Sequence, residues 1–126
     1  MAVLVDSSGW IEFVQSGANA SIFASALQEP LLIVPTVVAY EVTRFLRREV
    51  GDDAADQTLS RMQQCIVADL DLALAVEAAR LGIVERLAFA DSIILATARR
   101  YEATLWTQDA HFEGMASVHY IPTRAH

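Results

Sequence analysis

Short apolar runs rich in β-branched residues alternate with longer stretches of helical periodicity along the whole chain. The expected strands cover residues 2–5, 31–34, 65–68, 104–106 and 118–121. Helices are expected at residues 8–16, 18–28, 36–50, 53–64, 71–86 and 91–101, with a short helical turn near 109–113. Strands this short and apolar, separated by helices, predict an α/β/α sandwich around a mostly parallel sheet. In such sheets, ligands bind beyond the carboxyl ends of the strands.

Size and apolar content predict one domain spanning residues 1–126. Hydrophobic residues make up 54% of the 126 residues, which suits a single core. No apolar run reaches the ~18–20 residues of a membrane-spanning helix, and Asp6 shortens the N-terminal apolar run, so we expect no secretory signal. The single cysteine, Cys65, cannot form an internal disulfide. We therefore expect a cytoplasmic protein with no membrane partner.

The charged residues exclude several classes of protein. A net charge of −7 argues against a general nucleic-acid binder, although bound cations would reverse the local field. All nine Lys+Arg residues are arginine, so chemistry that needs a lysine ammonium is excluded. The excluded classes are the P-loop NTPases, the haloacid-dehalogenase phosphatases and the response-regulator receivers.

Four carboxylates stand inside or directly beside apolar segments. Asp6 ends AVLVD, Glu41 interrupts VPTVVAYEV, Asp91 opens ADSIILATA, and Asp109 follows LWT in LWTQD. Burying an acidic side chain is costly unless something neutralises it. When converging carboxylates have no basic partner nearby, the usual neutraliser is a hard divalent cation such as Mg²⁺ or Mn²⁺. The pattern therefore indicates a metal-dependent hydrolase.

Three of these acids also have a purely structural explanation. Asp6, Asp91 and Asp109 could each cap the helix or turn that follows. The shared-site hypothesis is stronger, because acids at strand and helix starts can converge on one rim of a parallel sheet.

Glu41 lies in the predicted helix 36–50, at the border of its apolar stripe. Arg44 and Arg48 follow it at i+3 and i+7 on the other side. This pattern suits a metal ligand beside arginines that contact phosphate. It equally suits a local ladder of ion pairs, worth only about 0.3–0.5 kcal/mol per pair.

Taken together, the segments VLVDSSGWIEF, VVAYEVTRFL, ADSIILATARRYEATLWTQDAHFEGM and VHYI resemble the PIN-domain ribonucleases. More narrowly, they resemble the VapC toxins of bacterial type II toxin–antitoxin pairs. The resemblance covers essentially the whole chain and depends on the order Asp, Glu, Asp, T-x-D. One departure is Ser92, where many relatives have alanine. The resemblance implies a PIN-like α/β/α fold, Mg²⁺- or Mn²⁺-dependent endoribonuclease activity on RNA, and neutralisation by a VapB-like antitoxin.

The resemblance also implies roles for individual residues. The metal-binding and catalytic acids would be Asp6, Glu41, Asp91 and Asp109. Ser8 and Thr107 would orient the carboxylates that bind the metal. Metal-dependent phosphodiester hydrolysis requires no protein nucleophile, which fits the lack of a persuasive Ser-His-Asp or Cys-His set. We interpret His111 and His119 as surface or partner-contacting residues.

The first two predicted helices carry more large apolar residues than one small core needs. These residues are Trp10, Ile11, Val14, Ile22, Phe23 and Leu27. The surplus predicts a homodimer and a surface reserved for a partner.

Two other functions are consistent with the sequence. One is a PIN-like interaction module without catalysis, and the other is a metal-dependent DNA nuclease or phosphatase on a similar sheet. The four acids argue against the interaction module, because buried carboxylates without a cation destabilise a fold. The residues do not distinguish RNA from DNA as the substrate.

Overall fold

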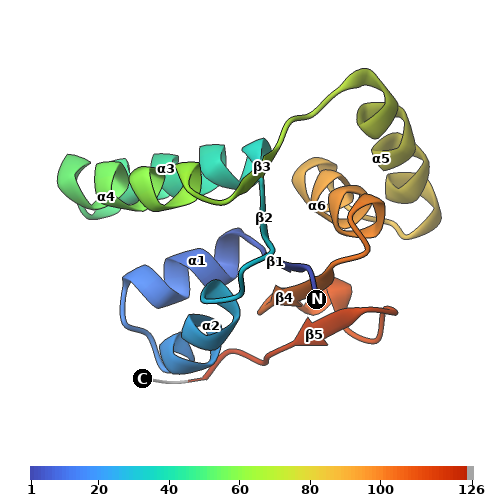
Figure 1. Cartoon of the computed structure of the whole chain (residues 1–126). Helices are drawn as coiled ribbons and strands as arrows, with labels where there is room; N and C mark the ends of the chain where they lie inside the picture. Colours follow the sequence, from blue (N-terminus) through green and yellow to red (C-terminus); the bar gives the residue numbers. More distant parts are fainter. Residues whose placement is uncertain (125–126) are drawn as a thin grey trace.

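A five-stranded parallel sheet lies at the centre of the molecule, and helices cover it (Figure 1). The computed structural model of the chain describes residues 1–124. The strand order is β3-β2-β1-β4-β5, and each neighbouring pair is parallel. The strands are β1 (Val3–Val5), β2 (Leu32–Pro35), β3 (Ile66–Ala68), β4 (Thr104–Thr107) and β5 (Val118–Tyr120). The predicted α/β class is confirmed, with every strand pair parallel.

Helices form near each predicted position. They are α1 (Ser7–Val14), α2 (Ala20–Leu27), α3 (Thr36–Glu49), α4 (Asp52–Gln63), α5 (Leu72–Val84), α6 (Phe89–Arg100) and the 3₁₀ turn η1 (Ala110–Phe112). Helices α1 and α2 pack against β1 and β4, while α6 packs against β2 and β4 and carries α5 on its outer side (Figure 1). No helix among residues 1–124 is long and apolar enough to span a membrane.

The core lies where the two central strands meet the flanking helices. Every residue of β1 and β2 is buried, as expected for parallel strands covered on both faces. Trp10, Phe23 and Leu27 also belong to this core. These three of the six residues from which a partner surface was predicted are therefore not part of any surface, because α1 and α2 turn them toward the sheet. Of that predicted surface, Ile11, Val14 and Ile22 are only partly buried.

Close packing of α1 on the sheet depends on Gly9. A Cβ at this position would lie 2.6 Å from Val5 Cγ1 and 2.7 Å from Phe23 Cδ1. Only a residue without a side chain lets the first turn of α1 approach β1 and α2 this closely. This contact matters for function because Asp6 lies between β1 and α1.

Candidate metal centre

Asp6 directly follows β1 and caps the N-terminus of α1. Its Oδ1 accepts hydrogen bonds from the Ser8 hydroxyl at 2.7 Å and the Gly9 N–H at 3.0 Å. Its Oδ2 accepts one from the Thr107 hydroxyl at 2.5 Å. With only 3% of its surface exposed, this carboxylate is held rigidly, and both hydroxyls predicted to orient a carboxylate contact it.

Burial raises the pKa of Asp6 from 3.8 to about 6. Hydrogen bonds from Thr107, Ser8 and Gly9 act in the opposite direction, and the negative charge of Asp109 raises this pKa further. The loss of hydration therefore outweighs three hydrogen bonds. The Asp6 carboxylate thus lies in an environment that a bound cation would relieve.

Asp91 and Asp109 join Asp6 at the same rim. Asp91 lies in the first turn of α6, and Asp109 follows β4 and caps η1. The pKa of Asp91 is raised from 3.8 to about 7, first by burial and then by the charge of Asp109 and a hydrogen bond with it, with a smaller effect of Asp6. His111 lowers this pKa. We call Asp6, Asp91 and Asp109 the acidic cluster.

Helix capping accounts in part for the positions of Asp6 and Asp109, but it does not account for the position of Asp91. Asp6 and Asp109 do cap α1 and η1. Asp91 caps nothing, because α6 begins at Phe89 and its N-cap is Ala88. Repulsion within the acidic cluster is therefore not a by-product of three caps.

The donor atoms of this site fit a divalent cation. One carboxylate oxygen each from Asp91 and Asp109 and one imidazole nitrogen of His111 all lie within 4.8 Å of one another. Within residues 1–124, no arginine forms an ion pair with Asp6, Asp91 or Asp109. Oxygen-rich, negatively charged sites of this kind suit Mg²⁺ or Mn²⁺.

His111 is the site residue whose place the sequence did not reveal. Its Nδ1 lies 2.7 Å from Asp109 Oδ1, and its backbone N–H donates to the same oxygen at 2.9 Å. The sequence signal for this contact was the spacing of Asp109 and His111, because an Asp that caps a tight turn holds the residue two positions later beside its carboxylate. Among residues 1–124, the second exposed imidazole is that of His119, which contacts the Trp106 ring in a tilted arrangement, with ring centroids 4.0 Å apart and an interplanar angle of 50°.

Glu41 lies in a different setting from the acidic cluster. It is partly buried on α3, and its Oε1 accepts a hydrogen bond from the Ser7 hydroxyl at 2.6 Å. Since Ser7 follows Asp6 in the chain, this bond links Glu41 to the rim. The structure thus brings three of the four predicted acids into electrostatic contact and connects the fourth through Ser7.

Glu41, Arg44 and Arg48 line one cavity of about 290 Å³. Within residues 1–124, neither arginine forms an ion pair with Glu41, and Arg48 pairs with Glu49 at 2.9 Å. The ladder of ion pairs that was an alternative for this helix is therefore not formed. Both arginines are exposed on the same flank as Glu41.

Comparison with known families gives a clear result: the family model of the PIN domain matches residues 3–118. The chain belongs to the PIN-domain family. No curated protein matches its sequence significantly.

Solved structures share the fold of this PIN domain at low sequence identity. A toxin–antitoxin complex from Klebsiella pneumoniae has a TM-score of 0.79 at 21% identity, covering 95% of this chain and 100% of that one. VapC20 of Mycobacterium tuberculosis, a toxin that cleaves the sarcin–ricin loop, has a TM-score of 0.78 at 18% identity, covering 91% and 95%. VapBC2 of Rickettsia felis, bound to promoter DNA, has a TM-score of 0.73 at 11% identity, covering 97% and 98%.

The pairing of the central strands in this PIN domain brings its acids together. Strands β1 and β4 are neighbours, with Val5 paired to Trp106. Both strands run in the same direction, so Asp6 and Thr107 leave the sheet at one edge, where their side chains bond. Topology therefore brings together residues from opposite ends of the chain.

Proposed function

We propose that this PIN domain is a Mg²⁺- or Mn²⁺-dependent endoribonuclease and the toxin of a type II toxin–antitoxin pair. The observation that carries the proposal is the acidic cluster, in which burial and the charge of Asp109 raise the pKa of both Asp6 and Asp91 at the carboxyl rim of the sheet. Its fold is shared with VapC20, a toxin described as cleaving the sarcin–ricin loop. We place the activity in the cytoplasm, where RNA is available.

Asp6, Asp91 and Asp109 would hold the ion, and we propose that Glu41 joins them from α3. When bound, the ion would acidify a coordinated water and offset charge on the phosphoryl group and the leaving 3′ oxygen. Ser8 and Thr107 keep the Asp6 carboxylate in one orientation through their hydrogen bonds.

We assign phosphate contacts to Arg44 and Arg48. Both are exposed beside Glu41, and guanidinium groups bind phosphate oxygens well. A chain with a net charge of −7 needs such local cations to receive RNA.

A cleavage assay tests the activity. Purified protein is incubated with structured RNA, single-stranded RNA and single-stranded DNA, each with EDTA, Mg²⁺ or Mn²⁺. We expect cleavage of RNA only with a divalent ion, and a loss of at least about 100-fold in Asp6→Asn and in Asp91→Asn. Asp71→Asn is the matched control, because Asp71 caps α5 and pairs with Arg100 outside the cluster.

The alternatives predict different outcomes of this assay. Preferential cleavage of DNA would favour the DNA nuclease. Inactivity on every substrate together with no metal binding would favour the non-catalytic module. Cleavage that resists EDTA, or full activity in both cluster variants, would contradict the proposed mechanism.

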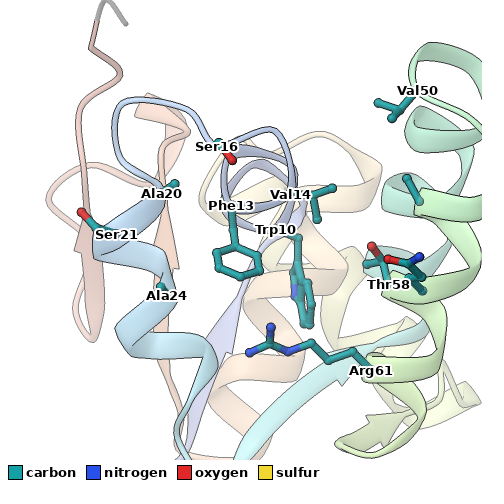
Figure 2. A pocket seen from close by; sticks show the side chains of 12 residues that line it. Trp10, Phe13, Val14, Ser16, Ala20, Ser21, Ala24, Val50, Thr58 and Arg61 are labelled. Atoms are coloured by element: carbon teal, nitrogen blue, oxygen red, sulfur yellow. The ribbon is translucent and has the colours of Figure 1, made fainter.

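A groove between α1, α2 and α4 is our proposed site for the VapB-like antitoxin (Figure 2). Its volume is about 660 Å³, and its walls include Phe13, Val14, Ala20 and Ala24. Arg61 lies across it, with its guanidinium 5.2 Å from the centre of the Phe13 ring (Figure 2). An apolar groove with a cation suits an amphipathic helix that carries an acidic residue. Co-expression with the gene next to it and co-purification test this partner.

We propose that α5 forms the homodimer contact, in place of the first two helices. Leu72, Val76 and Ile83 are 82%, 64% and 81% exposed. Together with Ala79, these residues are separated by four, three and four positions along α5. This spacing is the same in either direction along the helix. Two antiparallel copies would therefore place Leu72 against Ile83 and Val76 against Ala79.

Light scattering at micromolar concentration tests this contact. The wild type is expected to be a dimer, and Val76→Glu a monomer. Leu31→Glu is the matched control, since Leu31 is an exposed apolar residue away from α5. A monomeric wild type would refute the dimer. A dimeric Val76→Glu variant would show that the dimer contact does not involve this face of α5.

A further inference from the structure

His111 lies at the acidic cluster although its side chain is far more exposed than those of Asp91 and Asp109. It is the middle residue of η1, and its side chain is 74% exposed. Its Nδ1 lies 2.7 Å from Asp109 Oδ1 and 4.0 Å from Asp91 Oδ2. The imidazole therefore faces both carboxylates at once.

These separations match those between ligands of a single ion. Around an octahedral ion with bonds of ~2.0–2.1 Å, adjacent ligands lie about 3 Å apart and opposite ligands about 4 Å apart. The separation from Asp109 is close to the first value and the one from Asp91 is close to the second. One ion could bind all three atoms with little movement of the side chains.

Local structure holds the imidazole in this position. Asp109 Oδ1 accepts a hydrogen bond from the backbone N–H of His111 and lies 2.7 Å from its Nδ1. A bound ion would replace the proton shared by Nδ1 and this oxygen, so the same contact places both atoms beside the ion. Asp109 is itself fixed, since its backbone N–H donates to the Thr107 hydroxyl at 2.9 Å. The same hydroxyl binds Asp6, so His111 belongs to one connected network with the acidic cluster.

We infer that His111 is a metal ligand through Nδ1 and that it shifts the preference of the site from Mg²⁺ toward Mn²⁺. The inference deepens the proposed metal-dependent function and rests on it. Mg²⁺ prefers an all-oxygen environment, whereas imidazole nitrogen suits first-row transition ions. A site of carboxylates alone would not discriminate in this way.

A second role for His111 would leave the selectivity unchanged. The imidazole could stay bonded to Asp109 and only orient that carboxylate. Its removal would then weaken Mg²⁺ and Mn²⁺ binding by the same factor. Direct ligation instead predicts a selective loss.

Pulsed electron paramagnetic resonance of the Mn²⁺-loaded full chain separates the two roles. In the wild type we expect a ¹⁴N coupling from a directly bound imidazole, replaced by a ¹⁵N coupling after labelling with ¹⁵N-histidine. We expect the coupling to be absent in His111→Gln and unchanged in His119→Gln, whose imidazole contacts the Trp106 ring instead.

Isothermal titration with MnCl₂ and with MgCl₂ provides the second readout. His111→Gln should bind Mn²⁺ about 10-fold more weakly, and Mg²⁺ within about 2-fold of the wild type. If His111→Gln fails to fold, the labelled His119→Gln and His126→Gln variants decide, because a coupling that persists in both must come from His111.

Mn²⁺ binding without nitrogen coupling, or equal loss for both ions, would overturn the inference and leave the nuclease proposal intact. Absence of any metal binding to the wild type would overturn both.

Discussion

The acidic cluster and the open flank formed by Glu41, Arg44 and Arg48 are built in opposite ways. Asp6 is almost fully buried, accepts three hydrogen bonds and has a raised pKa. Glu41 accepts one hydrogen bond, from Ser7, and borders an open cavity with two exposed arginines. The cluster is therefore fixed and electrostatically strained, whereas the flank is relaxed and accessible.

This difference shows two ways of placing a carboxylate at a site. At the end of a central strand, the backbone sets the position and the core excludes water, so repulsion accumulates. On a helix beside the sheet, the side chain reaches the site and water screens its charge. We therefore expect substitutions in the acidic cluster to change the stability of the protein. Substitutions beside Glu41 should change RNA binding instead.

The largest expected effect is a loss of apo stability with rising pH. Both Asp6 and Asp91 have a pKa of 3.8 when unperturbed and of about 6 and about 7 in the fold. An acid with a raised pKa contributes stability below about pH 4 that is lost as the pH rises through its folded value. In EDTA, the free energy of unfolding should fall by at least about 2 kcal/mol between pH 5 and 7.5.

Urea denaturation across this range measures the effect. The fall in the free energy of unfolding with rising pH should become smaller in Asp6→Asn and in Asp91→Asn. It should persist in Glu41→Gln. The ion pair of Asp71 with Arg100 lowers the pKa of that acid, so its contribution is lost only at lower pH. A flat profile for the wild type would remove the distinction between the two regions.

Replacing Gly9 by alanine should damage the buried region alone. The added methyl group would meet Val5 and Phe23 at less than 3 Å, and overpacking of this kind costs about 1–3 kcal/mol. Thermal unfolding should show the loss. Gly82→Ala is the control, because its Cβ would meet Ser92 Cβ at an ordinary 3.4 Å. Equal stability of the two variants would contradict the close packing at α1.

Replacing Asp91 by asparagine should stabilise the apo protein while abolishing cleavage. Removing one of three repelling charges should raise the melting temperature in EDTA by about 3–5 °C at pH 7.5. Millimolar Mg²⁺ should then stabilise the variant less than the wild type. Glu41→Gln should leave the apo melting temperature unchanged. Identical metal shifts in Asp91→Asn and wild type would argue against a shared metal site.

The smallest effect is expected on the open flank. Arg44→Gln and Arg48→Gln should each raise the KM for RNA by about 3–10-fold and reduce its dependence on salt. Stability should not change, since both side chains are exposed. Arg80→Gln on α5, which breaks only the pair with Glu77, serves as the control. Unchanged KM in both flank variants would place the RNA elsewhere.

The sequence was sufficient to predict the sheet and the acids at its rim. Strands of three or four apolar residues were recognisable because both of their faces are buried. Once the sheet was parallel, Asp6 and Asp109 had to emerge at one edge. The contacts of Ser8 and Thr107 with Asp6 agree with the expectation from family resemblance.

Other features depend on three-dimensional packing that no local pattern encodes. Trp10 and Leu72 are both large apolar residues on helices, yet one is fully buried and the other 82% exposed. The difference arises because α1 packs on the sheet whereas α5 lies outside α6. The exposed apolar side of α5, where we propose the homodimer contact, therefore could not be located from composition. His111 was missed for a related reason, since an exposed histidine in a short turn gives no periodic signal.

The bond between Thr107 and Asp6 joins residues 101 positions apart in the chain. Protein synthesis delivers the N-terminal segment first, so β1 emerges long before the strand that completes its surroundings. The carboxylates from α6 and from the segment after β4 are also made long after Asp6. A nascent chain in which β4 has not yet been made therefore lacks Asp109 and the hydroxyl of Thr107, and it cannot form the acidic cluster.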